Sequence, residues 1–200
     1  MKIIIATANQ GKLKEIKKIL KNTNLDIVSS TQAGIVGQVN EDGKTLKANA
    51  VKKAKYVSTR TKQWSLADDT GLFIKALKNR PGVHTARWAG KNVNGKGLID
   101  FTLKKLKDLP QQNRQAYFKT VVALTSPNGK IYTFEGKIKG NLTKTPRGKI
   151  AKHLPYDSIF LPIGQKKTFA QMTKFQKNKI SHRSLGLKKL ADFIKQIANE

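Results

Sequence analysis

The chain has 200 residues, of which 40 are Lys or Arg and 12 are Asp or Glu, so its formal net charge is +28 at pH 7. No apolar stretch approaches the roughly 20 residues that a membrane-spanning helix needs, and the apolar run at the N-terminus is too short for a signal peptide. The absence of cysteine excludes disulfides, thiolate metal sites and a cysteine nucleophile. These features predict a cytoplasmic protein with no membrane segment.

The high positive charge has two interpretations. Lysines are spread along the whole chain rather than bunched in a tail, which is typical of a solvated surface. The same charge would attract nucleic acid, nucleotides or acidic lipid headgroups, so nonspecific binding of polyanions is expected from it. The sequence has no recognition-helix, zinc-finger or RNP-type pattern that would favour a dedicated nucleic-acid-binding module.

The first half of the chain alternates strands with helices. Its periodicity predicts a strand at 2–7, a helix at 12–21, a strand at 25–29, a loop at 30–44, a helix at 45–58 and a strand at 64–68 that ends at an acidic pair. A turn at 79–83 and a helix at 95–107 follow.

The second half is richer in strands. Residues 116–125 alternate and then run apolar, as a central strand does, and a turn at 126–129 separates them from a strand at 130–140. Apolar residues at helical spacing, from Leu187 to Ile197, mark a C-terminal amphipathic helix.

This order of elements predicts the fold class. Alternating strands and helices followed by a β-meander indicate an α/β protein with a mixed sheet. We expect one domain over residues 1–200, with a second lobe at about 100–165.

A polar turn joins the first strand to the first helix, and it consists of Thr7, Ala8, Asn9, Gln10, Gly11 and Lys12. Backbone N–H groups at a helix start favour an anion, and Lys12 adds a point charge, so this turn is a candidate phosphate site. The spacing is not that of a Walker A loop. A solvated strand–helix turn is the alternative interpretation.

Two adjacent carboxylates, Asp68 and Asp69, follow a short apolar run. Successive residues of a strand point to opposite faces, so we expect one carboxylate to meet a ligand while the other supports the turn through the backbone of Thr70 and Gly71. A carboxylate beside bound phosphates suggests Mg²⁺. A turn or helix-capping pair of aspartates is the alternative interpretation.

Two later segments are candidates for binding a nucleobase. In Leu154-Pro155-Tyr156-Asp157 an aromatic side chain precedes an acid, and the two would stack on a base and accept hydrogen bonds from it. The alternative is a core tyrosine in a turn. Lys177, His182 and Arg183 are candidate readers of a purine oxygen or a phosphate, with a surface His-Arg pair as the alternative.

Taken together and in this order, the segments resemble the inosine triphosphate pyrophosphatase family, the Ham1-like purine nucleoside triphosphate pyrophosphatases. The family's T-G-N-x-G-K-x-x-E reads TANQGKLKE here, and its A-D-D-S-G-L…P-G-V-x-S-A-R reads ADDTGLFIKALKNRPGVHTAR. Its F-G-Y-D-P-I-F reads LPYDSIF, and its A-E-M…K-x-x-I-S-H-R reads AQMTKFQKNKISHR. The resemblance covers nearly the whole chain.

The resemblance implies an elongated mixed β-sheet with flanking helices, in two lobes with a substrate cleft between them, and a homodimer. It implies Mg²⁺-dependent hydrolysis of ITP, dITP or XTP between the α- and β-phosphates, giving the monophosphate and pyrophosphate. Carried over by position, residues 7–12 and Lys53 would hold the phosphates. Asp69 would bind Mg²⁺ and activate the attacking water, with Thr70 beside it.

The second metal ligand departs from the family pattern. The family's acidic stretch before the second helix reads Asn40-Glu41-Asp42 here, and Asn40 falls where the ligating Glu belongs. Glu41 or Asp42 would have to substitute for it, and we take Glu41 as the predicted ligand. The usual E-N-A of that helix becomes Ala48-Asn49-Ala50.

The base end departs further. The resemblance implies that residues 154–157 cradle the base and sugar and that Lys177, His182 and Arg183 read the purine 6-oxygen. Leu154-Pro155 replaces Phe-Gly, which removes the aromatic ring expected to stack on the base and stiffens the turn. A catalytically weakened homologue that binds nucleotides or nucleic acid without turnover is therefore the alternative to an active enzyme.

Overall fold

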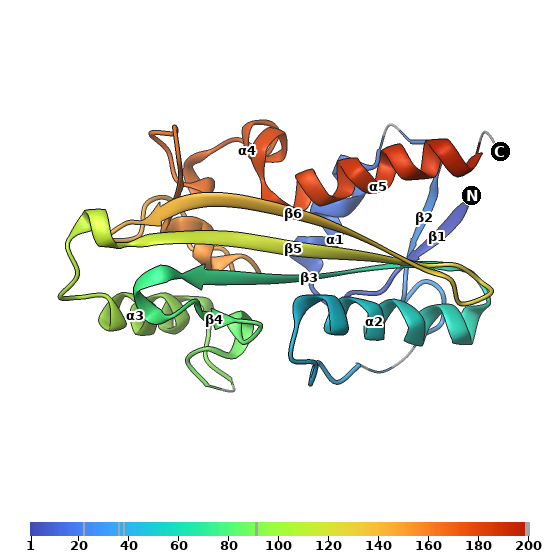
Figure 1. Ribbon diagram of the computed structural model, residues 1–200, viewed down its shortest axis with the longest axis horizontal. Coiled ribbons are helices and arrows are strands. Elements are labelled where there is room, and N and C mark those ends of the chain that lie inside the picture. Colours follow the sequence, from blue (N-terminus) through green and yellow to red (C-terminus); the bar gives the residue numbers. More distant parts are fainter. Residues whose placement is uncertain (22, 36, 38, 91, 199–200) are drawn as a thin grey trace. The chain divides into compact units, whose positions relative to one another are not determined.

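The structure is a computed structural model that describes residues 1–198 apart from residues 22, 36, 38 and 91. Its strands are β1 (Lys2–Ile5), β2 (Asp26–Ser29), β3 (Trp64–Ile74), β4 (Arg80–Gly82), β5 (Gln115–Thr125), β6 (Ile131–Leu142) and β7 (Phe160–Pro162). Its α-helices are α1 (Gln10–Ile19), α2 (Leu46–Thr61), α3 (Gly95–Lys105), α4 (Lys174–Ile180) and α5 (His182–Ala198) (Figure 1). Short 3₁₀ helices cover Lys75–Leu77, Thr85–Arg87, Gln111–Asn113, Pro155–Ser158 and Phe169–Gln171.

The strands form one mixed sheet in the order β2-β1-β3-β5-β6-β7, with β4 paired to β3. β1 runs parallel to both β2 and β3, whereas β4 runs antiparallel to β3 and β7 antiparallel to β6. The predicted α/β class with a mixed sheet is confirmed. None of the helices in the described part of the chain has the length and apolar character that crossing a membrane requires.

The chain divides into two compact units. Unit 1 contains Met1–Thr70, Thr120–Gly136 and His182–Glu200, and unit 2 contains Gly71–Lys119 and Lys137–Ser181. β3, β5 and β6 each contribute residues to both units. Each unit has its own apolar core.

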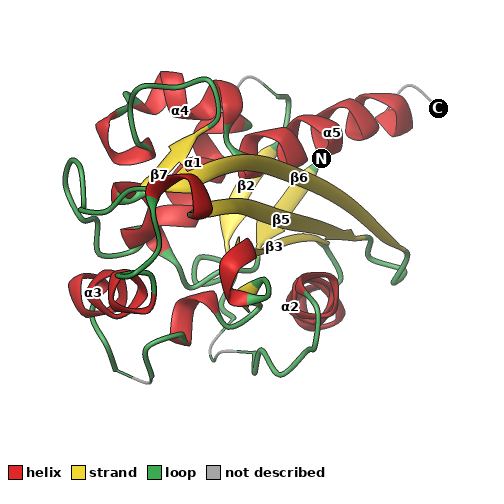
Figure 2. Ribbon diagram, turned by 60° about the vertical axis from the view of Figure 1, so that its left-hand side comes forward, coloured by secondary structure: helices red, strands yellow, loops and turns green. Residues whose placement is uncertain are grey.

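Helices cover both faces of the strands in unit 1 (Figure 2). On one face, Ile3 and Ile5 of β1 pack with apolar residues of α1 and α5. On the other face lies α2, whose Ala50 and Ala54 are fully buried. Because side chains alternate along a strand, this arrangement decides which helices each residue of β3 meets.

The core of unit 2 contains Tyr156, which is 5% exposed and packs with residues of α3. The Thr102 hydroxyl donates to the carbonyl oxygen of Leu98 at 2.8 Å, so the Tyr156 hydroxyl is the donor in its 3.2 Å contact with Thr102 Oγ1. The structure therefore supports the core-tyrosine interpretation of this ring.

Replacing Tyr156 with Phe is expected to lower the free energy of unfolding by about 1 kcal/mol at pH 8, because one buried hydrogen bond is lost. Burial raises the pKa of the Tyr156 hydroxyl above its ordinary value of 10.0. A group whose pKa is higher in the folded protein than in the unfolded chain contributes its full stabilisation at pH values below the unfolded pKa. This stabilisation is lost as the pH rises towards the folded pKa. The difference in free energy of unfolding between wild type and Tyr156→Phe, measured with urea, should therefore become smaller from pH 8 to pH 11. A constant difference would contradict this.

Candidate active site

The acidic pair lies inside β3, not at its end as the sequence predicted. Asp68 is 0% exposed and Asp69 is 5% exposed. The strand continues through them because both carboxylates find basic or amide partners on the flanking helices. Alternation places Asp68 on the side of α1 and α5 and Asp69 on the side of α2, as their contacts show. The prediction that the two carboxylates point to opposite faces is confirmed.

Asp68 has one strongly bonded oxygen and one orphaned oxygen. Its Oδ2 lies 3.1 Å from Lys12 Nζ and accepts hydrogen bonds from Arg183 Nε at 3.2 Å and Thr70 Oγ1 at 3.1 Å. Its Oδ1 is buried and receives no hydrogen bond from the described residues. Burial alone would raise the pKa of Asp68, but Lys12, Arg183 and Lys53 hold it well below its ordinary value. Asp68 is therefore a permanently charged anchor for basic side chains.

Arg183 begins α5 together with His182, and both side chains are buried, at 1% and 4% exposure. The alternative of a surface His-Arg pair is therefore wrong. Every guanidinium nitrogen of Arg183 has a partner in unit 1: Nε donates to Asp68, Nη1 pairs with Glu15 Oε2, and Nη2 donates to Thr70 Oγ1 at 3.3 Å. This geometry does not support the prediction that Arg183 reads the purine.

The start of α5 approaches β6 unusually closely. A Cβ on Gly136 would lie 1.9 Å from the carbonyl oxygen of His182 and 2.6 Å from the backbone nitrogen of Gly186. Only glycine at position 136 permits this approach. The contact sets where His182 and Arg183 lie in unit 1.

Asp69 meets α2 on the opposite face. Its Oδ2 accepts a hydrogen bond from Asn49 Nδ2 at 3.1 Å, and its Oδ1 lies 3.6 Å from Lys53 Nζ. Burial raises the pKa of Asp69, although Lys53 and Lys12 oppose this. A carboxylate held in this way is a better proton acceptor than an exposed aspartate.

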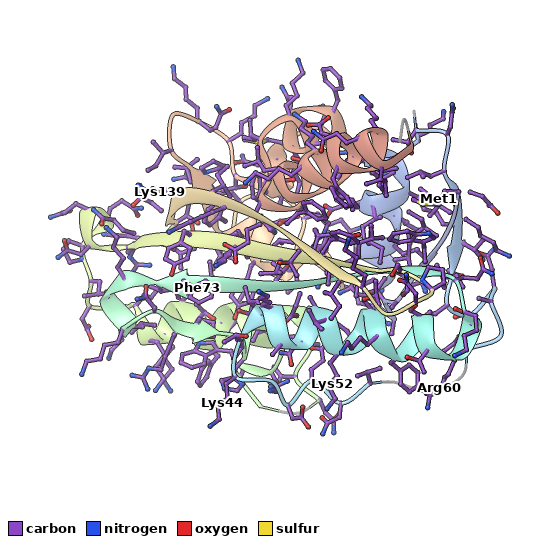
Figure 3. The ribbon with its side chains drawn as sticks, turned by 45° about the vertical axis from the view of Figure 1, so that its right-hand side comes forward. Met1, Lys44, Lys52, Arg60, Phe73 and Lys139 are labelled. Carbon is purple, nitrogen blue, oxygen red and sulfur yellow. The ribbon has the colours of Figure 1, made fainter. Side chains whose placement is uncertain are left out.

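Lys53 connects Asp69 to the loop before α2. Its Nζ donates to Glu41 Oε1 at 2.7 Å and to the carbonyl oxygen of Asp68 at 2.8 Å. Asp42 instead pairs with Lys52 at 2.7 Å, with both side chains exposed, and Figure 3 shows Lys52 on the outer side of α2. Of the two acids that the sequence offered as a second ligand, Glu41 is the one held beside Asp69.

The candidate phosphate turn is a capped helix start. Asn9 is the N-cap of α1, and its side chain accepts a hydrogen bond from the Lys12 backbone at 3.0 Å, while Thr7 Oγ1 accepts from the Asn9 backbone at 3.2 Å. Gln10, Gly11 and Lys12 thus form the first turn of the helix. The non-glycine residues with positive φ in the described chain do not include Ala8, so alanine in place of the family's glycine costs no backbone strain there.

The remaining candidates lie in unit 2. Leu154 precedes the 3₁₀ helix Pro155–Ser158, and Asp157 pairs with Lys177 at 2.5 Å. Lys177 is 6% exposed, and its ammonium lies 5.4 Å from the centre of the Phe169 ring. The predicted aromatic–acid segment is therefore divided between a core tyrosine and an acid that pairs with a lysine.

Sequence reasoning missed three residues that hold this arrangement in unit 1: Asn49, Glu15 and Thr120, whose Oγ1 lies 2.6 Å from Thr70 Oγ1. A signal was present for Asn49. It lies one helical turn before Lys53 within a face of small and apolar residues of α2, where a buried amide needs partners.

The two carboxylates beside Lys53 fit the kind of site at which Mg²⁺ binds. Mg²⁺ is usually bound through one or two carboxylates together with substrate oxygens and water. Asp69 and Glu41, joined by Lys53, provide that number of carboxylates.

Comparison with known proteins gives one consistent result. A sequence model of the Ham1 family matches residues 3–193. The dITP/XTP pyrophosphatases of Thermoanaerobacter pseudethanolicus and Bacillus subtilis are 40% and 38% identical, each over 96% of its own length and 97% and 96% of this chain. Among solved structures, a HAM1 protein from Coxiella burnetii matches with a TM-score of 0.87 and 32% identity, covering 98% of this chain and 99% of that one. The Staphylococcus aureus Ham1 protein matches with a TM-score of 0.84 and 31% identity over the same shares.

Proposed function

Because the chain belongs to the Ham1 family, we propose that it hydrolyses purine nucleoside triphosphates such as ITP, dITP and XTP to the monophosphate and pyrophosphate. The names of the curated relatives, dITP/XTP pyrophosphatases at 37–40% identity, support this substrate class. Such an enzyme removes these nucleotides from the pool used for nucleic-acid synthesis.

The observation that carries the proposal is the charge balance around the acidic pair. Three buried or half-buried cations, Lys12, Lys53 and Arg183, meet four carboxylates there: Glu15, Glu41, Asp68 and Asp69. Four of the 12 acidic residues of a chain with net charge +28 are thus gathered around this pair. A site of this kind suits a divalent cation that arrives with a polyphosphate.

The phosphates would meet α1 at its first turn. Backbone N–H groups that point out of a helix start attract anions, and Lys12 lies in that turn. Lys12 is also tied to Asp68, and burial lowers its pKa although Asp68 opposes this. We propose that residues 7–12 and Lys53 hold the triphosphate.

Asp69 and Glu41 would hold Mg²⁺. When bound, the metal supplies positive charge that offsets the charge of the phosphates. Asp69 accepts the proton of the water that attacks the α-phosphorus. The bond from the α-phosphorus to the bridging oxygen breaks, so that pyrophosphate leaves and the water oxygen remains on the monophosphate.

The base would be recognised by residues other than Arg183, whose guanidinium is already satisfied. Lys177, paired with Asp157, remains a predicted contact for the base or sugar. Leu154 offers a branched aliphatic contact, which is weaker than an aromatic ring, so we expect a KM higher than with the family's Phe at this position rather than a loss of turnover.

A substrate panel tests the proposal. Pyrophosphate release is measured from ITP, dITP, XTP, ATP and GTP, with Mg²⁺ and with EDTA. We expect ITP, dITP and XTP to be hydrolysed at least about tenfold faster than ATP, and only with the metal. Release from none of them would favour the weakened homologue, and equal rates for all five would contradict the substrate class.

A further inference from the structure

We propose that Asn49 is a positioning residue, whose side-chain amide locks the loop that carries Glu41 to the carboxylate of Asp69. The inference builds on the proposed function, in which those two carboxylates act together. Asn49 does not touch the phosphates or the water in this scheme. It would fix the geometry of the groups that do.

The side-chain amide of Asn49 makes one hydrogen bond to Asp69 in β3 and one to Gly43 in the loop before α2. Its Nδ2 donates to Asp69 Oδ2 at 3.1 Å, and its Oδ1 accepts from the backbone N–H of Gly43 at 2.8 Å. The side chain is 1% exposed. In a buried environment these two hydrogen bonds are worth more than on the surface, and each is costly to leave unmade.

An amide is required for this pair of contacts. The Gly43 N–H can only donate, so the group facing it must be an acceptor, and the charged Asp69 oxygen needs a donor. Asparagine offers both at the end of one short side chain. Aspartate at position 49 would accept at both sides and would place a second negative charge against Asp69.

Gly43 completes the contact from the other side. A Cβ on Gly43 would lie 2.5 Å from Asn49 Oδ1 and 2.9 Å from Ala48 Cβ. Only glycine lets the loop backbone come this close to α2. Gly43 is two residues after Glu41, so a fixed Gly43 limits where the Glu41 side chain can lie.

Asn49 and Lys53 are one turn apart on α2, and both connect Asp69 to the loop before α2, by different means. Lys53 holds the Glu41 side chain and Asp69 through charge, at 2.7 and 3.6 Å. That hold weakens when another cation neutralises the carboxylates. The neutral amide of Asn49 instead accepts a hydrogen bond from the loop backbone, and this bond does not depend on whether a cation is present.

The test compares Asn49→Ala and Gly43→Ala, which break the contact from opposite ends, with Thr45→Ala as the matched control. Thr45 caps the same helix, and its side chain accepts a hydrogen bond from Ala48 N at 3.0 Å, within the first turn of that helix. Four quantities are measured: hydrogen exchange of the residue 43 amide by NMR without nucleotide, Mg²⁺ binding by calorimetry, kcat for ITP, and KM for ITP.

We expect the amide of Gly43 to exchange at least about tenfold faster in Asn49→Ala. Both contact variants should bind Mg²⁺ about 10- to 100-fold more weakly, as is found when groups that orient metal ligands are removed. kcat should fall more than KM rises. The double variant Asn49→Ala/Gly43→Ala should be no worse than Asn49→Ala alone, and Thr45→Ala should keep the Mg²⁺ affinity of the wild type.

Unchanged exchange at Gly43 in Asn49→Ala would overturn the inference, as would additive losses in the double variant or an equal loss in Thr45→Ala. These outcomes are separate from failure of the proposed function. If the wild type released no pyrophosphate, exchange and Mg²⁺ binding would still decide the role of Asn49.

Discussion

Replacing Asp69 with Asn is expected to abolish pyrophosphate release from ITP while the chain remains folded. The substitution keeps the shape of the side chain but removes the oxygen that accepts a proton and the charge that attracts a metal. General-base catalysis alone contributes about 10²- to 10⁴-fold, so kcat should fall by at least about that factor. The chain should remain folded, because Lys53 keeps its ion pair with Glu41 at 2.7 Å and its hydrogen bond to the carbonyl oxygen of Asp68 at 2.8 Å. The measurement is pyrophosphate release together with urea unfolding of both proteins.

The matched control for this experiment is Asp42→Asn. Asp42 belongs to the same acidic stretch as Glu41, but its exposed carboxylate pairs with Lys52 on the outer side of α2. We expect Asp42→Asn to retain wild-type kcat. Equal release by Asp69→Asn and wild type would remove Asp69 from the centre of the reaction, whatever the substrate preference of the enzyme proves to be.

The sequence was sufficient to predict that Asp68 and Asp69 face opposite sides of the sheet, because this follows from strand geometry alone. Side chains alternate wherever a strand continues, so two adjacent acids must face different neighbours. The local sequence pattern does not identify the helices that face each carboxylate. Their identity depends on α1 and α5 sharing one face of unit 1 with Ile3 and Ile5, while α2 lies on the other.

The boundaries of β3 were mispredicted for a related reason. Two charged residues followed by Thr70 and Gly71 read as the end of a strand, because unpaired acids are costly to bury. The structure buries them with Lys12, Arg183 and Lys53 as partners, and the strand continues to Ile74. Those partners lie far away in the sequence, so no local window contains them.

The same limit explains the residues whose roles were missed or misread. The pattern around Tyr156 was compatible with a base-stacking ring and with a core ring, and the structure packs this ring with residues of α3. No role was predicted for Glu15 beyond its place in the motif TANQGKLKE. Its role became visible only when α5 brought Arg183 against α1.

Arg183→Met is expected to lower the free energy of unfolding by about 3–5 kcal/mol at neutral pH. The substitution keeps the unbranched apolar stem of the side chain but removes the guanidinium, so it leaves the carboxylates of Asp68 and Glu15 without their shared partner. Removing one partner of a buried ion pair costs more than the pair contributes, because the remaining charge is uncompensated. The control is Lys52→Met, which removes an exposed lysine from a pair worth about 0–1 kcal/mol. Urea unfolding at pH 7 measures both.

The pH dependence separates this role from that of a base reader. The depressed pKa of Asp68 means that its stabilisation is present above the unfolded pKa of about 3.9 and is lost as the pH falls towards the folded value. Arg183→Met should therefore differ most from wild type near pH 7, and the gap should close below about pH 4. If Arg183 instead read the purine, the variant would keep wild-type stability and lose its preference for ITP over ATP. The opposite result is a fall in the free energy of unfolding with an unchanged preference among the nucleotides. That result would show that Arg183 holds Asp68 in place and that other side chains select the base.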